Sequence, residues 1–284
     1  MKLVNINKSY GSFQASKDIS FEVPQGSLTA LLGPSGSGKT TILRMIAGLE
    51  QPDSGDIIIG GKRVNDVPAS QRGIGFVFQN YALFRYMTVF DNVAFGLKVQ
   101  KKDKKYIRSR VMETLDLVGL SGLEKRYPSQ LSGGQRQRIA FARAIAPSPE
   151  LLLLDEPFAA IDAKVRSELR TWLKETITKL GITSIFVTHD QDEAIEVADK
   201  LIVTNNGRIE QIGTPLEVYQ NPKTAFMAKF FGSTSEVLHY EDFDTFDRID
   251  DYDHAYVRPE FIKVTREDEK QKYAHSAVEQ TFFR

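Results

Sequence analysis

One octapeptide constrains this chain more than any other part of its sequence: Gly33-Pro34-Ser35-Gly36-Ser37-Gly38-Lys39-Thr40. It fits a pattern in which glycines let several backbone N–H groups converge on one phosphate. The apolar run Leu28–Leu32 before it predicts a buried strand, and 40–48 after it predicts a helix, with Thr41 in its first turn. A flexible Gly/Ser turn is the alternative, but it does not explain this placement between strand and helix. Lys39 would reach the outer phosphates of a nucleotide, and Thr40 would offer a hydroxyl to Mg²⁺.

A second apolar run, Leu151–Leu154, leads directly into Asp155 and Glu156. If this strand neighbours the phosphate loop in a parallel sheet, its end lies beside the phosphates. Asp155 is then placed to hold Mg²⁺, and Glu156 to polarise a water molecule in line with the terminal phosphate. A strand followed by an acidic helix start is the alternative reading, and the phosphate loop argues against it.

The order of predicted elements indicates an α/β fold with a largely parallel sheet, and the octapeptide at 33–40 indicates the P-loop NTPase class within it. Strands are predicted at 3–6, 19–23, 75–78 and 183–188, hairpins at 56–64 and 201–212, and helices at 104–118, 136–146 and 162–180. We expect one domain over 1–232, with an N-terminal antiparallel β subdomain and an inserted helical subdomain at about 81–146. Residues 233–284 form a C-terminal extension, either a loop region or part of a small β domain. Its segment Glu236–His254 holds eight acidic residues and one basic residue.

Composition excludes several classes of protein. Lys+Arg and Asp+Glu both number 37, which argues against a strongly basic nucleic-acid-binding protein. There is no cysteine, so disulfides, thiol catalysis and cysteine-ligated zinc are excluded. No apolar run approaches the roughly 20 residues that a spanning helix needs. We therefore expect a cytoplasmic protein without an export signal that can still dock onto a membrane partner.

The segment Ser132-Gly133-Gly134-Gln135 opens a predicted helix. Ser132 as N-cap and Gln135 three residues later form a capping box, which is a purely local explanation. It does not explain two consecutive glycines, which cost helix stability but allow a phosphate to approach closely. Both readings stay open on the residues alone.

About 20 residues separate this segment from Asp155-Glu156, and at that spacing it resembles the signature motif of ABC-transporter ATPases. Further positions match in family order over about residues 1–235. Gln79 resembles the Q-loop glutamine, which implies a contact with Mg²⁺, and His189 resembles the switch histidine, which implies a contact with the γ-phosphate. Asp162 resembles the aspartate of the D-loop, where Ile161 stands in place of the more common leucine. Tyr10 matches the aromatic that stacks on adenine, with Phe13 as its rival.

The resemblance implies ATP and Mg²⁺ as cofactors and a head-to-tail dimer of two copies. In such a dimer Lys39 of one copy and Ser132 and Gly134 of the other hold each γ-phosphate. It also implies two integral membrane permease subunits, reached through Gln79 and residues 80–92, an external substrate-binding protein, and no nucleic acid. The chain would then lie peripherally at the cytoplasmic face of the cell membrane.

Three further segments resemble the sulfate/thiosulfate importers within this family: Phe76–Asn92, Asp162–Leu173 and Tyr256–Glu260. Importers of molybdate, iron, polyamines or sugars share the core and are the alternatives. A soluble ABC ATPase of DNA repair or translation and a P-loop kinase or GTPase are more remote. ABC ATPases of DNA repair or translation usually have a long coiled-coil insertion or two cassettes in one chain, and neither is found in this sequence. The segment Ser132–Gln135 argues against a kinase or GTPase.

Overall fold

The computed structural model describes residues 1–159, 163–232, 235–238, 254–257 and 281–282. The chain divides into two compact units, Met1–Ile212 and Gly213–Arg284. Each unit is described by itself. The predicted boundary between residues 232 and 233 stays a prediction.

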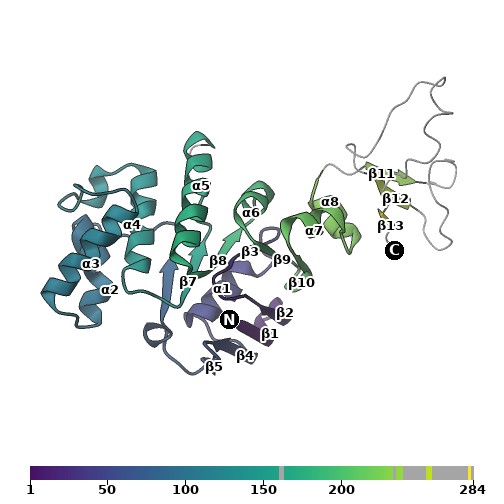
Figure 1. The fold of residues 1–284 in the computed structure, drawn as a ribbon. Coiled ribbons are helices and arrows are strands. Elements are labelled where there is room, and N and C mark those ends of the chain that lie inside the picture. Colours follow the sequence, from purple (N-terminus) through teal and green to yellow (C-terminus); the bar gives the residue numbers. More distant parts are fainter. Residues whose placement is uncertain (160–162, 233–234, 239–253, 258–280, 283–284) are drawn as a thin grey trace, which may run out of the picture. The chain divides into compact units, whose positions relative to one another are not determined.

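The first unit is built on a six-stranded sheet with the order β10-β9-β3-β8-β7-β6 (Figure 1). Its strands are β3 (Leu28–Leu32), β6 (Ile74–Val77), β7 (Leu151–Asp155), β8 (Thr183–Thr188), β9 (Lys200–Asn205) and β10 (Arg208–Gly213). The five strands from β9 to β6 pair in parallel. Strands β3, β7 and β8 are buried along their whole length, as expected for a parallel sheet covered on both faces.

A second sheet, antiparallel and four-stranded, has the order β2-β1-β4-β5. It consists of β1 (Lys2–Tyr10), β2 (Phe13–Glu22), β4 (Ser54–Ile59) and β5 (Lys62–Arg63). Helix α1 (Lys39–Ala47) packs against β2 of this sheet and against β7 and β8 of the other. One apolar core therefore runs from Leu3 through Ile42 and Ile46 to Leu153.

Three helices form a separate lobe, which lies at the left of Figure 1: α2 (Val89–Val99), α3 (Lys104–Leu117) and α4 (Gly133–Ile145). Helix α4 packs against α2, α3 and β6, and so joins the lobe to the sheet. Helices α5 (Ala163–Leu180) and α6 (Gln191–Val197) pack on the sheet, α5 against β3 and α6 against β3 and β8. Two single 3₁₀ turns complete the unit, at Ala69–Gln71 and Pro128–Gln130.

The second unit contains α7 (Pro215–Gln220), α8 (Ala225–Phe230) and a small antiparallel sheet in the order β11-β12-β13. Its strands are β11 (Ser235–Leu238), β12 (His254–Val257) and β13 (Thr281–Phe282). Ala228 of α8 packs on Tyr256 of β12. The Tyr256 hydroxyl donates to Glu236, which also pairs with Lys229. Most of the acidic segment, 239–253, lies outside the described residues.

The predicted elements are present, with two corrections at their ends. The strands predicted at 3–6 and 19–23 are the outer parts of one long hairpin, β1 and β2, that reaches Tyr10 and Phe13. The extension was not predicted, because the residues near the turn have no alternating apolar pattern, although their backbones pair. The helix predicted from Arg136 begins at Gly133, since the capping box at Ser132 places both glycines inside its first turn.

Arg72 gives a test of what holds α1 in place. Its side chain is 4% exposed, and it donates to the carbonyls of Met45 and Ile46 at the end of α1 and to those of Asn65 and Val67. Arg72→Met leaves these buried carbonyls unpaired, and we expect it to lower the free energy of unfolding by about 3 kcal/mol. Urea denaturation followed by circular dichroism measures this.

The matched control is Arg63→Met, which removes two ion pairs made by an exposed arginine. Exposed pairs contribute little, so its denaturation midpoint should equal that of the wild type. Equal midpoints for all three proteins would show that Arg72 does not anchor α1.

Candidate functional site

The predicted residues of the phosphate loop and the predicted Gln79, Asp155, Glu156 and His189 lie at one edge of the parallel sheet, where four neighbouring strands end. Gly33 follows β3, Gln79 comes shortly after β6, Asp155 ends β7, and His189 follows β8. The register pairs Leu32 with Thr188 and Asp155 with Val187. Carboxyl ends of parallel strands are the usual place for ligands in such sheets. The strand order thus brings together residues that are up to 156 positions apart, Gly33 and His189.

Two glycines of the phosphate loop, Gly33 and Gly38, leave no room for a side chain. A Cβ on Gly38, whose φ is +91°, would lie 2.0 Å from the carbonyl oxygen of Ala15, and one on Gly33 would lie 2.1 Å from that of Thr204. Ser37 is buried and its hydroxyl bonds that of Thr204, 3.1 Å away, whereas Ser35 is exposed and Pro34 half-buried. The loop is therefore held from outside by β2 and β9.

Lys39 is buried, and its ammonium donates to the carbonyls of Gly33 and Pro34, both at 2.7 Å. Burial lowers the pKa of Lys39, while the carboxylates of Glu156 and Asp155 oppose that shift. The cation thus already lies inside the loop that is predicted to hold a phosphate. Thr41, the neighbour of Thr40 in the first turn of α1, is half-buried.

Thr40 and Asp155 supply oxygen atoms at a single point. The Thr40 hydroxyl donates to Asp155 Oδ1 at 3.1 Å, and Asp155 is 7% exposed. Burial raises the pKa of Asp155, and the hydrogen bond from Thr40 opposes this. A hydroxyl and a buried carboxylate side by side form a donor set of the kind that Mg²⁺ prefers.

Glu156 is the centre of a three-residue contact. Gln79 Nε2 donates to Glu156 Oε2 at 2.8 Å, and His189 Nδ1 lies 3.3 Å from Glu156 Oε1. The backbone of Glu156 is left-handed, with φ of +46°, a strain of the kind that gathers at functional sites. These three residues line a cleft of about 270 Å³ together with Thr188 and Phe158. The three residues predicted from separate motifs therefore meet.

A buried network that the sequence did not predict supports the backbone beside His189. The Thr188 hydroxyl donates to Glu193 and accepts from the N–H of Asp190. Arg170 of α5 pairs with both Asp190 and Glu193. Burial raises the pKa of Glu193. The spacing Asp190-x-x-Glu193, which caps α6, was the available signal.

Ser132 makes the predicted capping box. Its hydroxyl accepts from the N–H of Gln135 at 3.2 Å, and Gln135 Oε1 accepts from the N–H of Ser132 at 3.0 Å. Ser132 is exposed, and Gly133 and Gly134 are half-exposed in the first turn of α4. Among the described residues, no hydrogen bond joins Ser132–Gln135 to the phosphate loop. Ser132–Gln135 begin α4 and the loop precedes α1, so the two segments lie on different elements of the unit.

Two aromatic residues remain candidates for stacking on a base. Tyr10 and Phe13 face each other in the register at the end of the β1–β2 hairpin, 46% and 54% exposed. The ammonium of Lys8 lies 5.3 Å from the centre of the Tyr10 ring. Asp162, the predicted D-loop residue, lies outside the described residues.

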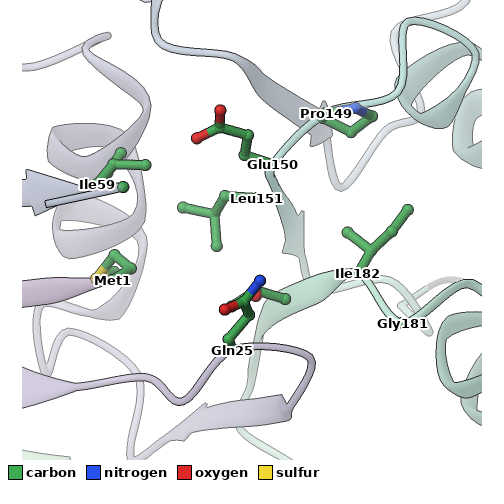
Figure 2. Close-up of a pocket in the computed structure, with 10 residues that line it drawn as sticks. Met1, Gln25, Ile59, Pro149, Glu150, Leu151, Gly181 and Ile182 are labelled. Atoms are coloured by element: carbon green, nitrogen blue, oxygen red, sulfur yellow. The ribbon is translucent and has the colours of Figure 1, made fainter.

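A larger cavity, of about 460 Å³, lies at the opposite end of the strands (Figure 2). It is lined by Met1, Ile59 and Glu150 and by the amino-terminal ends of β7 and β8 at Leu151 and Thr183. None of the predicted site residues lines it. Size therefore does not identify the functional site here.

Comparison with known proteins agrees with this geometry. The sequence model of the ABC transporter family matches residues 16–159. The chain belongs to the ABC transporter family. The predicted fold class, the predicted resemblance and the predicted cofactors of the family, ATP and Mg²⁺, are confirmed. Across the part of the chain that the structure describes, no helix is both long and apolar enough to cross a membrane.

Individual relatives cover most of the chain. A sulfate/thiosulfate import ATP-binding protein CysA of Synechococcus elongatus is 51% identical over 270 residues, which are 93% of this chain and 77% of that protein. The CysA of Bacillus cereus is 50% identical over 288 residues, 94% of this chain and 79% of that protein. The dimeric structure of the ATP-binding cassette MJ0796 in a post-hydrolysis state, bound to ADP and Pi, superposes with a TM-score of 0.67. It is 33% identical and covers 75% of this chain and 98% of that one.

Two glycines of the phosphate loop provide a matched test, because Gly38 has no room for a Cβ atom and Gly36 has. Gly38→Ala would place a Cβ against the backbone of Ala15, and we expect it to weaken binding of a fluorescent ATP analogue by at least about 100-fold. Gly36 has φ of +80°, but a Cβ added there would meet nothing within 4 Å, so Gly36→Ala adds only backbone strain and should weaken binding about tenfold. Equal losses would contradict a rigid cradle.

Proposed function

We propose that this chain is the ATP-hydrolysing subunit of an importer that takes up sulfate or thiosulfate, and that Glu156 is its general base. The observation that carries the proposal is the contact of Glu156 with Gln79 and His189 at the end of β7. One residue before Glu156, Asp155 contacts the first turn of the helix that follows the phosphate loop. A base, a polar sensor and a phosphate cradle at one sheet edge are the parts that phosphoryl transfer to water needs.

Binding of the nucleotide falls to the loop Gly33–Gly38 and the first turn of α1. Lys39 would exchange its two carbonyl acceptors for phosphate oxygens, which balance its charge better. Thr40, Asp155 and Gln79 would hold Mg²⁺, which neutralises charge on the phosphates when bound. Tyr10 would stack on the adenine, and Phe13 is the rival for that contact.

In the hydrolytic step Glu156 would accept a proton from the attacking water. Its carboxylate is half-buried and contacts Gln79 and His189, which would turn away from it to make room for the water. His189, whose side chain is 58% exposed, is free to turn toward the γ-phosphate. Gln79 would release Glu156 and contact Mg²⁺ when the nucleotide is in place.

The site needs a second copy of the chain. Helix α4 packs on α2, α3 and β6, whereas α1 packs on β2, β7 and β8, so Ser132 and Lys39 belong to different parts of the unit. In a head-to-tail dimer Ser132, Gly133, Gly134 and Gln135 of one copy would cover the nucleotide held by the other, and Asp162 would lie near the shared interface. The cassette MJ0796, similar in fold, is dimeric with ADP and Pi.

A groove beside Gln79 is the surface we assign to the membrane permease subunits. It holds about 360 Å³ and is lined by aromatic and apolar side chains, among them Phe76, Phe84, Phe95 and Pro147. Phe84 and Phe95 are each more than a third exposed, and their rings lie 4.6 Å apart. Phe78, Ala82 and Phe84, on either side of Gln79 in the chain, also line it, so permease contact there would reach the segment that carries Gln79. We propose that the chain lies peripherally at the cytoplasmic face of the membrane and that an external binding protein delivers the cargo.

The choice of cargo rests on the relatives, because an ATPase subunit does not touch what is transported. Both relatives described above are sulfate/thiosulfate import proteins by name. Importers of molybdate, iron, polyamines or sugars are the alternatives, and a soluble ATPase outside transport is the remote one.

Glu156→Gln tests the base. We expect unchanged ATP affinity and hydrolysis slower by about 100-fold or more, because a positioned general base contributes on that order. The matched control is Glu150→Gln, an exposed carboxylate just before the other end of the same strand, which should hydrolyse ATP like the wild type. Steady-state turnover of Glu156→Gln at the wild-type rate would refute the assignment.

The cargo is tested in the assembled transporter. Membrane permease subunits should co-purify with the chain, and in liposomes sulfate with its binding protein should stimulate ATP hydrolysis several-fold over the basal rate. Stimulation by molybdate or a sugar, but not by sulfate or thiosulfate, would contradict the cargo. Co-purification with DNA instead of membrane subunits would favour the soluble alternative.

A further inference from the structure

The turn that follows Gln79 has an unusual backbone. Tyr81 and Ala82 are consecutive residues with left-handed φ angles, +63° and +44°. Neither is glycine, so each is disfavoured there by contact between its Cβ and the following carbonyl. Such a pair persists only where surrounding contacts hold it in place.

Arg143 supplies those contacts. Its Nη1 donates to the carbonyl of Ala82 at 2.6 Å and its Nη2 to that of Tyr81 at 2.8 Å. The guanidinium also lies 5.5 Å from the centre of the Phe84 ring. A planar guanidinium suits two adjacent carbonyls, because its two N–H groups point the same way. One side chain thus spans both left-handed residues.

Arg143 lies on α4, the helix that Ser132 begins. Arg136 lies seven residues earlier and therefore on the same face of α4. Burial raises the pKa of the Tyr81 phenol, and the charge of Arg136 opposes that shift. The hydrogen bonds from Arg143 are what join the turn to α4. Movement of the signature end of α4 would be carried to the turn through a continuous helix.

On its other side the turn is connected to the site. The N–H of Tyr81 donates to the carbonyl of Phe78 at 2.8 Å and closes a turn that contains Gln79. Gln79 in turn donates to Glu156. A shift at residues 81 and 82 therefore changes where the Gln79 amide points.

We propose that Arg143 is a positioning residue for Gln79: it holds the left-handed Tyr81–Ala82 turn against the signature helix, so that the reach of Gln79 to Glu156 is set by the position of α4. The proposal rests on the proposed function, in which Glu156 is the base.

The test compares ATP hydrolysis by the full chain and four variants: Arg143→Ala, Arg143→Lys, Arg143→Ala with Ala82→Gly, and Arg110→Ala. Arg143→Ala should lower kcat about tenfold, the scale of one unsupported left-handed residue, with unchanged ATP affinity. Arg143→Lys should fall between, since an ammonium lacks the fork. Glycine at 82 accepts the left-handed turn without support, so the double variant should recover most of the loss.

Arg110→Ala is the matched control. Arg110 also donates to backbone carbonyls at the end of α4, those of Ile145 and Ala146, but not to the turn after Gln79. Its removal should affect stability and leave kcat unchanged. If Arg143→Ala does not fold, Arg143→Lys with and without Ala82→Gly makes the same comparison.

Normal kcat in Arg143→Ala would overturn the proposal. So would a loss that Ala82→Gly does not restore, because Arg143 would then act by another route. Hydrogen exchange of a peptide covering residues 78–84, measured without nucleotide, tests the role of Arg143 independently of whether the proposed ATPase function is correct. This peptide should exchange faster in Arg143→Ala than in Arg110→Ala, even if the wild type hydrolysed no ATP. Equal exchange in the two variants would show that Arg143 does not hold the Tyr81–Ala82 turn.

Discussion

The pairing of β7 between β8 and β6 is the constraint on which the rest of the site depends. Parallel strands need apolar cover on both faces, and the four leucines of β7 are at most 1% exposed. Polar groups can therefore stand only at the strand's end. Asp155 and Glu156 occupy that end, with the end of β8 on one side and of β6 on the other. The same burial that stabilises the sheet thus places Glu156 beside Gln79 and His189, and Asp155 beside Thr40.

Several buried or half-buried arginines of this chain bind backbone carbonyls in irregular segments. Arg72 closes the end of α1, Arg110 the end of α4, and Arg143 the turn after Gln79. Carbonyls at the carboxyl ends of helices carry partial negative charge and lack intrahelical partners. A guanidinium can therefore donate hydrogen bonds to them, and no carboxylate is needed as its partner. These contacts join neighbouring elements at places where backbone hydrogen bonds between paired strands do not form. The backbone around the site is consequently held by side chains from elsewhere in the fold.

Patterns that act over a few residues were readable from the sequence. The phosphate loop, the leucine strand of β7 and the capping box at Ser132 all depend on neighbours in the chain, and the structure contains each of them. The turn at Tyr81 and Ala82 was not readable, because its left-handed backbone depends on Arg143, some 60 residues away. Glu193 had a local signal in the spacing Asp190-x-x-Glu193, but its burial, which follows from the packing of α5 against α6, had none. Sequence patterns do not predict polar contacts between residues far apart in the chain, because such contacts leave no periodic signal.

Ser132 shows how one hydroxyl can serve both of the roles that its segment suggests. In the capping box its oxygen accepts a hydrogen bond from the N–H of Gln135, which uses one lone pair. Its own O–H stays available to donate, and a phosphate needs a donor. The cap also fixes the direction of the side chain, so the hydroxyl does not lose rotational freedom again when a ligand arrives. Local helix stability and the proposed contact with a phosphate are thus compatible at this residue, because the capping box leaves the serine O–H available to donate.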